Sequence, residues 1–214
     1  LFNDTVLAGT DLTLRTGGGV DIVTFAKAVR ATSGNVLLDF GAVRANRSLL
    51  TMSDTLRAGT DITMVNTGTG GFSATFQMAV TAGGNIVMDT GDGYDVITAN
   101  AVISAGRNIT VTMDGGGDVF TLAAAGELTA RGNVSVNMGD FDGIADEAQA
   151  LGKINAGGGL VISNRGAGPS NLNLTGGEIV AGKGGFTLQT GDGDDTVLMT
   201  GLVITSEGAL TLDF

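Results

Sequence analysis

Short segments of alternating apolar and polar residues recur along the whole chain at a nearly constant interval. Each segment follows a small or polar residue, here called the anchor. Successive anchors lie 23 to 26 residues apart, and they are Asp11, Asn35, Asp61, Asn85, Asn108, Asn133, Gly159, Gly185 and Ala209. Nine anchors with so little drift in their spacing indicate an internal structural repeat of about 25 residues.

Two apolar columns follow the anchors. The residue directly after each anchor is Leu12, Val36, Ile62, Ile86, Ile109, Val134, Leu160, Phe186 or Leu210. The residue two positions further on is Leu14, Leu38, Met64, Met88, Val111, Val136, Ile162, Leu188 or Leu212. Because successive side chains of a strand point to opposite faces, this pattern predicts a strand that is buried on one face only.

Each repeat has room for two further short strands. We expect the second at residues 21–25, 95–98, 118–122 and 195–199, and the third at residues 101–104, 177–180 and 202–205. Stacked coils bury the apolar face because like residues fall above like. The sequence therefore predicts an all-β fold, a right-handed three-sided parallel β-solenoid of eight to nine coils. An antiparallel sandwich of hairpins is the alternative, but it requires neither the constant interval nor uniform columns.

The repeat covers residues 1–214, which predicts a single solenoid domain. The chain starts at Leu1 without a methionine, so we expect it to be a segment of a longer protein or fibre. The last repeat stops after its first strand, and no proline or charge cluster shields either end of the stack. We expect the ends to be covered by end-to-end self-association into fibres or by adjoining solenoid domains.

The amino-acid composition limits the kinds of functional site and partner that the protein can have. The chain has 37 glycines, one proline, one tyrosine, and no tryptophan, cysteine or histidine. Abundant glycine among 43% hydrophobic residues fits a fold with many tight turns, and the missing cysteine and histidine exclude familiar catalytic triads and zinc sites. A net charge of −11 argues against nucleic acid as a partner. No apolar run reaches 18 residues, so no membrane span is expected.

Four anchor segments carry a family resemblance. The phrases "AGTDLTL" (8–14), "AGGNIVM" (82–88), "AGRNITV" (105–111) and "ARGNVSV" (130–136) resemble repeats of filamentous-haemagglutinin-like adhesins. Those adhesins are large secreted bacterial surface proteins built as parallel β-solenoids. The resemblance covers nearly the whole chain and implies an extracellular or cell-surface location.

The glycine-rich turns resemble a second group. "TGDGYDVIT" (90–98) is similar to the calcium-binding nonapeptide of secreted RTX proteins at Gly91, Gly93, Asp95 and Ile97, and residues 16–24 and 190–198 match in the same way. In RTX proteins the motif recurs every nine residues, whereas here it occurs once per coil. The resemblance implies calcium as a cofactor.

Stacking gives an independent reason to expect a cation. Turns about 4.8 Å apart bring their carboxylates together, and the carboxylates repel unless a cation neutralises them or the side chains splay into water. Calcium binds six to eight oxygen ligands, which carboxylates and glycine carbonyls supply. The predicted ligands are Asp92, Asp95, Asp114, Asp118, Asp140 and Asp142 at a central corner, with Asp192, Asp194 and Asp195 as a separate cluster. The alternative is that Asp and Gly simply form good turns.

The sequence predicts a structural protein rather than an enzyme. We expect the shaft of an adhesin, a biofilm-matrix fibre or a surface layer, with surface glycans as further partners. The alternative is a carbohydrate-binding or carbohydrate-cleaving β-helix, in which paired carboxylates act on a sugar. Sugar clefts usually offer aromatic platforms, and this chain has one tyrosine and no tryptophan.

Outward threonines and an alanine-rich segment are two further local features of the sequence. Outward threonines on the anchor strand suggest an ice-binding face, but Leu37, Val87 and Val161 interrupt that column, so we expect an ordinary solvated strand. The alanine-rich segment at residues 139–155 suggests a helical turn on one edge of the solenoid.

Overall fold

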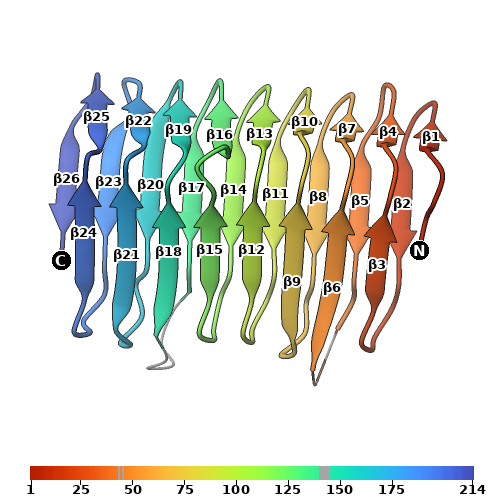
Figure 1. Cartoon of the computed structure of the whole chain (residues 1–214), viewed down its shortest axis with the longest axis horizontal. Helices are drawn as coiled ribbons and strands as arrows, with labels where there is room; N and C mark the ends of the chain where they lie inside the picture. The colour runs from red at the N-terminus through yellow and green to blue at the C-terminus, as the bar shows by residue number, and fades with distance from the viewer. Residues whose placement is uncertain (43, 45, 140–144) are drawn as a thin grey trace.

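The computed structural model describes residues 1–42, 44, 46–139 and 145–214. These residues form a β-solenoid, in which 26 strands make three parallel sheets (Figure 1). Each coil contributes one strand to each sheet in turn, and every third strand along the chain belongs to the same sheet. This architecture confirms the predicted fold class and rules out the antiparallel sandwich.

The sheets are named by the order in which the chain enters them. Sheet 1 contains β1 (Val6–Ala8), β4 (Val29–Ala31), β7 (Leu56–Ala58), β10 (Val80–Ala82), β13 (Val102–Ala105), β16 (Glu127–Ala130), β19 (Lys153–Ala156), β22 (Glu178–Ala181) and β25 (Val203–Ser206). Sheet 2 contains β2 (Leu12–Arg15), β5 (Val36–Asp39), β8 (Ile62–Val65), β11 (Ile86–Asp89), β14 (Ile109–Thr112), β17 (Val134–Asn137), β20 (Gly159–Ser163), β23 (Gly185–Gln189) and β26 (Leu210–Asp213). Sheet 3 contains β3 (Ile22–Phe25), β6 (Arg47–Met52), β9 (Gly71–Phe76), β12 (Val96–Ala99), β15 (Val119–Leu122), β18 (Asp146–Ala150), β21 (Ser170–Thr175) and β24 (Thr196–Thr200).

The winding is right-handed. In Figure 1 the strands of sheet 3 rise in front, those of sheet 2 descend behind, and the chain advances from the N-terminus on the right to the C-terminus on the left. The corner between sheets 1 and 2 is called corner A, and the longer glycine-rich corner between sheets 2 and 3 is called corner B.

The predicted columns lie in register between coils. Ile86 pairs with Ile62 on one side and with Ile109 on the other, and Met88 pairs with Met64 in the same way. Parallel neighbours therefore carry the same kind of side chain, as the anchor spacing predicts.

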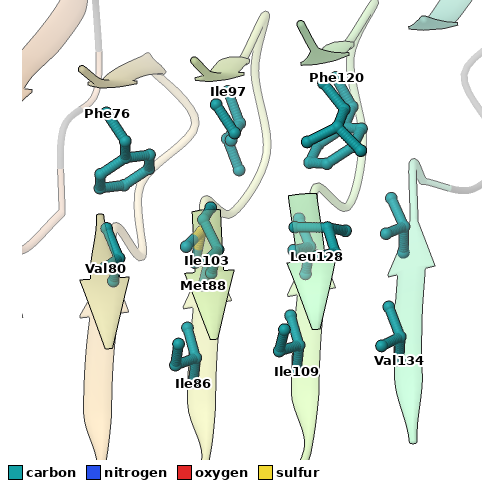
Figure 2. Close-up of a cluster of buried hydrophobic side chains, with 14 of the residues drawn as sticks. Phe76, Val80, Ile86, Met88, Ile97, Ile103, Ile109, Phe120, Leu128 and Val134 are labelled. Atoms are coloured by element: carbon teal, nitrogen blue, oxygen red, sulfur yellow. The ribbon is translucent and has the colours of Figure 1, made fainter. Parts of the chain in front are cut away.

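All three sheets send side chains into one continuous core (Figure 2). Within the coils shown there, Ile86 and Ile109 come from sheet 2, Ile97 from sheet 3 and Ile103 from sheet 1, and each is at most 1% exposed. Burying a side chain of this size stabilises the fold by roughly 1.5–3 kcal/mol, so each coil gains most of its stability from these inward residues.

The segment at residues 139–155 differs from the expectation of a helical turn. Its described part forms β18 and the start of β19, so the predicted helical turn is wrong there. Ala148 and Ala150 pair with Phe120 and Leu122 and face the core, so alanine here marks a narrow inward position of a strand. Across the described residues, no helix has the length and apolar character needed to cross a bilayer.

Candidate functional site

The glycines of corner B allow the turns to stack closely. Gly93 and Gly116 have φ angles of 117° and 135°, a region that side-chain-bearing residues rarely adopt. A Cβ atom on Gly116 would overlap the carbonyl oxygen of Gly93 in the preceding coil. The glycines of this turn are therefore required by backbone packing, whether or not a cation is bound.

An aspartate ladder runs through corner B. In several coils, an aspartate at or just before the start of a sheet 3 strand accepts a backbone N–H from the coil before it. Asp95 Oδ1 accepts the Phe72 N–H at 2.6 Å, Asp118 Oδ1 accepts the Asp95 N–H at 2.9 Å, and Asp146 Oδ1 accepts the Asp118 N–H at 2.7 Å. These three carboxylates are at most 5% exposed. The turn aspartates therefore bond one coil to the next.

Residues at the equivalent position of other coils make the same kind of hydrogen bond. Near the C-terminal end, Asp195 Oδ1 accepts the Ser170 N–H at 2.8 Å. Near the N-terminal end, the Ser48 hydroxyl oxygen accepts the Asp21 N–H at 3.0 Å. Serine and aspartate are interchangeable here because the position requires only a side-chain oxygen within reach of the neighbouring amide.

Burial makes the Asp95 carboxyl less acidic. Loss of solvation raises the pKa of Asp95 from 3.8 to about 7. Hydrogen bonds from the Thr90 side chain and the Phe72 amide, and the charge of Arg47, act in the opposite direction. The negative charge of Asp114 adds to the rise. Asp95 consequently exchanges its proton near neutral pH.

The remaining predicted metal ligands that the structure describes are more exposed than the buried ladder carboxylates. The side chains of Asp92, Asp114, Asp192 and Asp194 are exposed, and Asp195 is half-buried. Asp140 and Asp142 lie outside the described residues. Within the described ranges, no three acidic side chains come close enough to hold a metal ion. Each ladder aspartate commits one oxygen to a backbone amide, and calcium binding at this corner stays a prediction.

A second ladder, formed by the anchor residues, occupies corner A. Asp61 Oδ1 accepts the N–H of Asn85 at 2.6 Å and its Nδ2–H at 3.2 Å, and Asn85 Oδ1 does the same for Asn108 at 3.3 and 3.1 Å. Asn108 Oδ1 continues the series to the Asn133 N–H at 2.8 Å, and Asn133 Oδ1 to the Gly159 N–H at 2.7 Å. The sequence identifies these residues as anchors but does not show the hydrogen bonds between them. The one sequence feature that points to these bonds is that Asp and Asn carry a side-chain oxygen at the same distance from the backbone.

The two ladders bond the coils in opposite directions. At corner A each side chain accepts an amide of the following coil, whereas at corner B it accepts an amide of the preceding coil. Every coil between Asp61 and Asp146 is thus tied to both neighbours by side-chain polar bonds in addition to the strand ladders.

One exposed hollow combines an aromatic ring with a guanidinium group. The Arg47 guanidinium lies 4.3 Å from the centre of the Tyr94 ring, across Gly71, which separates their coils. Asn46, with a φ of 66°, completes the lining of this hollow of about 410 Å³. Tyr94 is 51% exposed, so its ring is accessible to a ligand from solution.

These features define the protein as a three-sided parallel β-solenoid with polar ladders at two corners. No family model, curated protein or solved structure matches the chain.

Proposed function

We propose that this protein is structural: a secreted or surface-displayed β-solenoid that forms the shaft of an adhesin, a matrix fibre or a surface layer. One observation carries the proposal. The inward apolar residues of the three sheets and the polar ladders continue from coil to coil, so each coil is bonded mainly to its two neighbours. Eight steps of about 4.8 Å produce a rod roughly 40 Å long, and its length grows simply by adding coils.

Both ends of the rod have the surface that an added coil requires. Leu210 and Leu212 continue the core columns of sheet 2, yet they are 53% and 42% exposed. At the other end, Leu12 and Leu14 occupy the same columns and are only partly buried. Further solenoid coils, from adjoining domains or from end-to-end copies, would bury these side chains and pair the open strands.

The proposal is tested by imaging and sizing the purified chain. We expect negative-stain electron microscopy and light scattering to show rods that lengthen with protein concentration. Replacing Leu210 and Leu212 with lysine should leave short particles without lowering the melting temperature of the remaining coils. Globular monomers at every concentration, with the lysine variant behaving like the parent chain, would count against a shaft.

Calcium stiffening stays a prediction. The ladder bonds themselves do not involve the ion, because the Oδ1 atom of each ladder carboxylate accepts a backbone amide directly. Thermal melting in millimolar calcium and in chelator measures the effect. A higher melting temperature in calcium, absent with magnesium, would support a site that includes Asp92 or Asp114.

Carbohydrate binding is the second candidate, and the hollow at Tyr94 favours it. An aromatic ring beside a guanidinium and an amide offers the stacking and hydrogen bonding that a sugar uses. Glycan-array binding that disappears with Tyr94→Ala, but not with Arg57→Ala on sheet 1, would favour this function over a purely structural one. Cleavage is not expected, because Asp95 and Asp118 are buried and bonded to backbone amides.

A further inference from the structure

A rank of five threonines crosses the outer face of sheet 3. The strand pairing places them side by side on β3, β6, β9, β12 and β15, and they are Thr24, Thr51, Thr75, Thr98 and Thr121. All five are half-exposed, because the neighbouring strands cover their flanks. Only the register between coils shows this rank, since the intervals between these threonines vary from 23 to 27 residues.

The rank lies in an uncharged surface. The outward column beside it holds Ile22, Leu49, Ser73, Val96 and Val119. The residues that follow the strands are also uncharged, and they are Ala26, Ser53, Gln77, Asn100 and Ala123. The first charge along the columns is Glu147 on β18, and Arg47 at the corner B edge is held against Tyr94. On a molecule with a net charge of −11, an uncharged face of this extent points to a neutral partner.

Unlike this face of sheet 3, the outer faces of sheets 1 and 2 carry charged side chains. Sheet 2 presents Arg15 paired with Asp39, and sheet 1 presents Arg30 beside Arg57 and Lys153 bonded to Glu178. The half-exposed threonines of sheet 2 are interrupted by Leu37 and Val87. The unbroken rank is therefore a property of sheet 3 alone among the three described faces.

We infer that this face binds the surface of ice. The hydroxyls repeat at the strand spacing of about 4.8 Å, on a backbone that the coil-to-coil hydrogen bonds already hold rigid. A single hydroxyl repeated at a fixed interval offers no pocket for a soluble ligand, but it matches a partner that is itself periodic and neutral. Apolar groups in the neighbouring column, including Val96 and Val119, leave the water next to the hydroxyls free to order, whereas charged groups would orient water around themselves. Rigid spacing removes the entropic cost of arranging the groups on contact.

The regularity is greatest over the last three strands of the rank. There Thr75, Thr98 and Thr121 lie beside Ser73, Val96 and Val119, which are similar in height, whereas Leu49 on β6 is longer. Association with a second copy through the same face is the competing explanation, and the dimer outcome of the test below distinguishes it from ice binding.

Ice-shaping microscopy, thermal hysteresis and inhibition of ice recrystallisation test this inference on the intact chain. We expect faceted crystals with the parent protein and loss of the effect with Thr98→Lys. Thr110→Lys is the matched control, since Thr110 is a half-exposed strand residue of sheet 2 at the same level of the rod. It should keep the full effect.

Two conservative variants distinguish a loss of ice binding from a loss of folding. Thr98→Val keeps the methyl group and replaces the hydroxyl, whereas Thr98→Ser keeps the hydroxyl and removes the methyl group. Both should melt close to the parent chain while reducing activity by several-fold. Absence of hysteresis and recrystallisation inhibition in the folded parent chain would overturn the inference. Equal loss with Thr98→Lys and Thr110→Lys would overturn it as well, as would a stable dimer that disperses with Thr98→Lys.

Discussion

Asp118 accepts the backbone N–H of Asp95 from the preceding coil, at 2.9 Å, through a carboxylate that is fully buried. This bond changes the interpretation of the glycine–aspartate turns. An aspartate at this position satisfies an amide at a corner where the strand ladder ends, which is sufficient reason for its presence. The ladder of corner B is thus part of the solenoid's backbone bonding.

Removal of that acceptor should destabilise the rod. Asp118→Ala leaves the Asp95 N–H buried without its partner, at a cost of about 1–3 kcal/mol in the free energy of unfolding. Asp118→Asn keeps an oxygen at the same place and should lose less. Urea unfolding followed by circular dichroism measures both. Asp92→Ala, on an exposed side chain of the same corner, is the control, and an equal loss in all three variants would refute the ladder's role.

The stability should depend on pH through Asp95. Its pKa of about 7 in the folded state lies above its ordinary value of 3.8, so folding takes up a proton between these values. The stabilisation from this group is present near pH 4 and is lost as the pH rises through about 7. We expect the melting temperature to fall between pH 5 and pH 8. Asp95→Asn should flatten that part of the profile, and an unchanged slope in the variant would assign the effect to other carboxylates.

The anchor ladder of corner A should also contribute to stability, but less than the buried ladder. Asn108 accepts the Asn133 N–H and donates to Asn85, so Asn108→Ala breaks the series on both sides. A loss of about 0.5–1.5 kcal/mol is expected, because water can reach the exposed Asn133 amide and replace part of the bond. Arg107→Ala, one residue earlier on an exposed side chain, should change stability by less than about 0.5 kcal/mol. Chemical denaturation that ranks the two variants the other way would contradict this account.

The fluorescence of Tyr94 can be used to detect its contact with Arg47. The chain has one tyrosine and no tryptophan, so its intrinsic fluorescence comes from this residue. Arg47→Ala should change the emission and acrylamide quenching of Tyr94 while costing only about 0.5–1 kcal/mol. Gly71→Ala should have a larger effect on stability, since a Cβ there overlaps the Tyr94 carbonyl oxygen. Unaltered quenching in Arg47→Ala would show that the contact is not kept in solution.

The sequence predicts the fold well because the apolar columns constrain it at every coil. A shift of one residue in β11 would send Ile86 and Met88 to the solvent face, so period and spacing together determine the register. The predicted second and third strands begin within one residue of β12, β13 and β22. The helical turn is wrong because the alanine-rich composition does not show that Ala148 occupies an inward strand position.

The corners are less predictable because spacing does not show what each side-chain atom contacts. Asp95 matches a calcium motif in sequence, yet its Oδ1 accepts the Phe72 amide of the neighbouring coil. Asp146 belongs to the same ladder, but it lacks the flanking glycine pattern and only the strand pairing of β15 with β18 reveals it. The threonine rank of sheet 3 is likewise visible only once the coils are in register.

Engineered disulfides test the stacked coils most directly, because the chain has no cysteine of its own. Val87 and Thr110 face outward as paired residues of β11 and β14, and strands about 4.8 Å apart suit a disulfide, which needs Cα atoms roughly 4.4–6.8 Å apart. Val87→Cys with Thr110→Cys should cross-link within the monomer under mild oxidation, whereas Val87→Cys with Thr112→Cys should remain reduced. Cross-linking of the second pair in preference to the first would contradict the parallel, in-register solenoid.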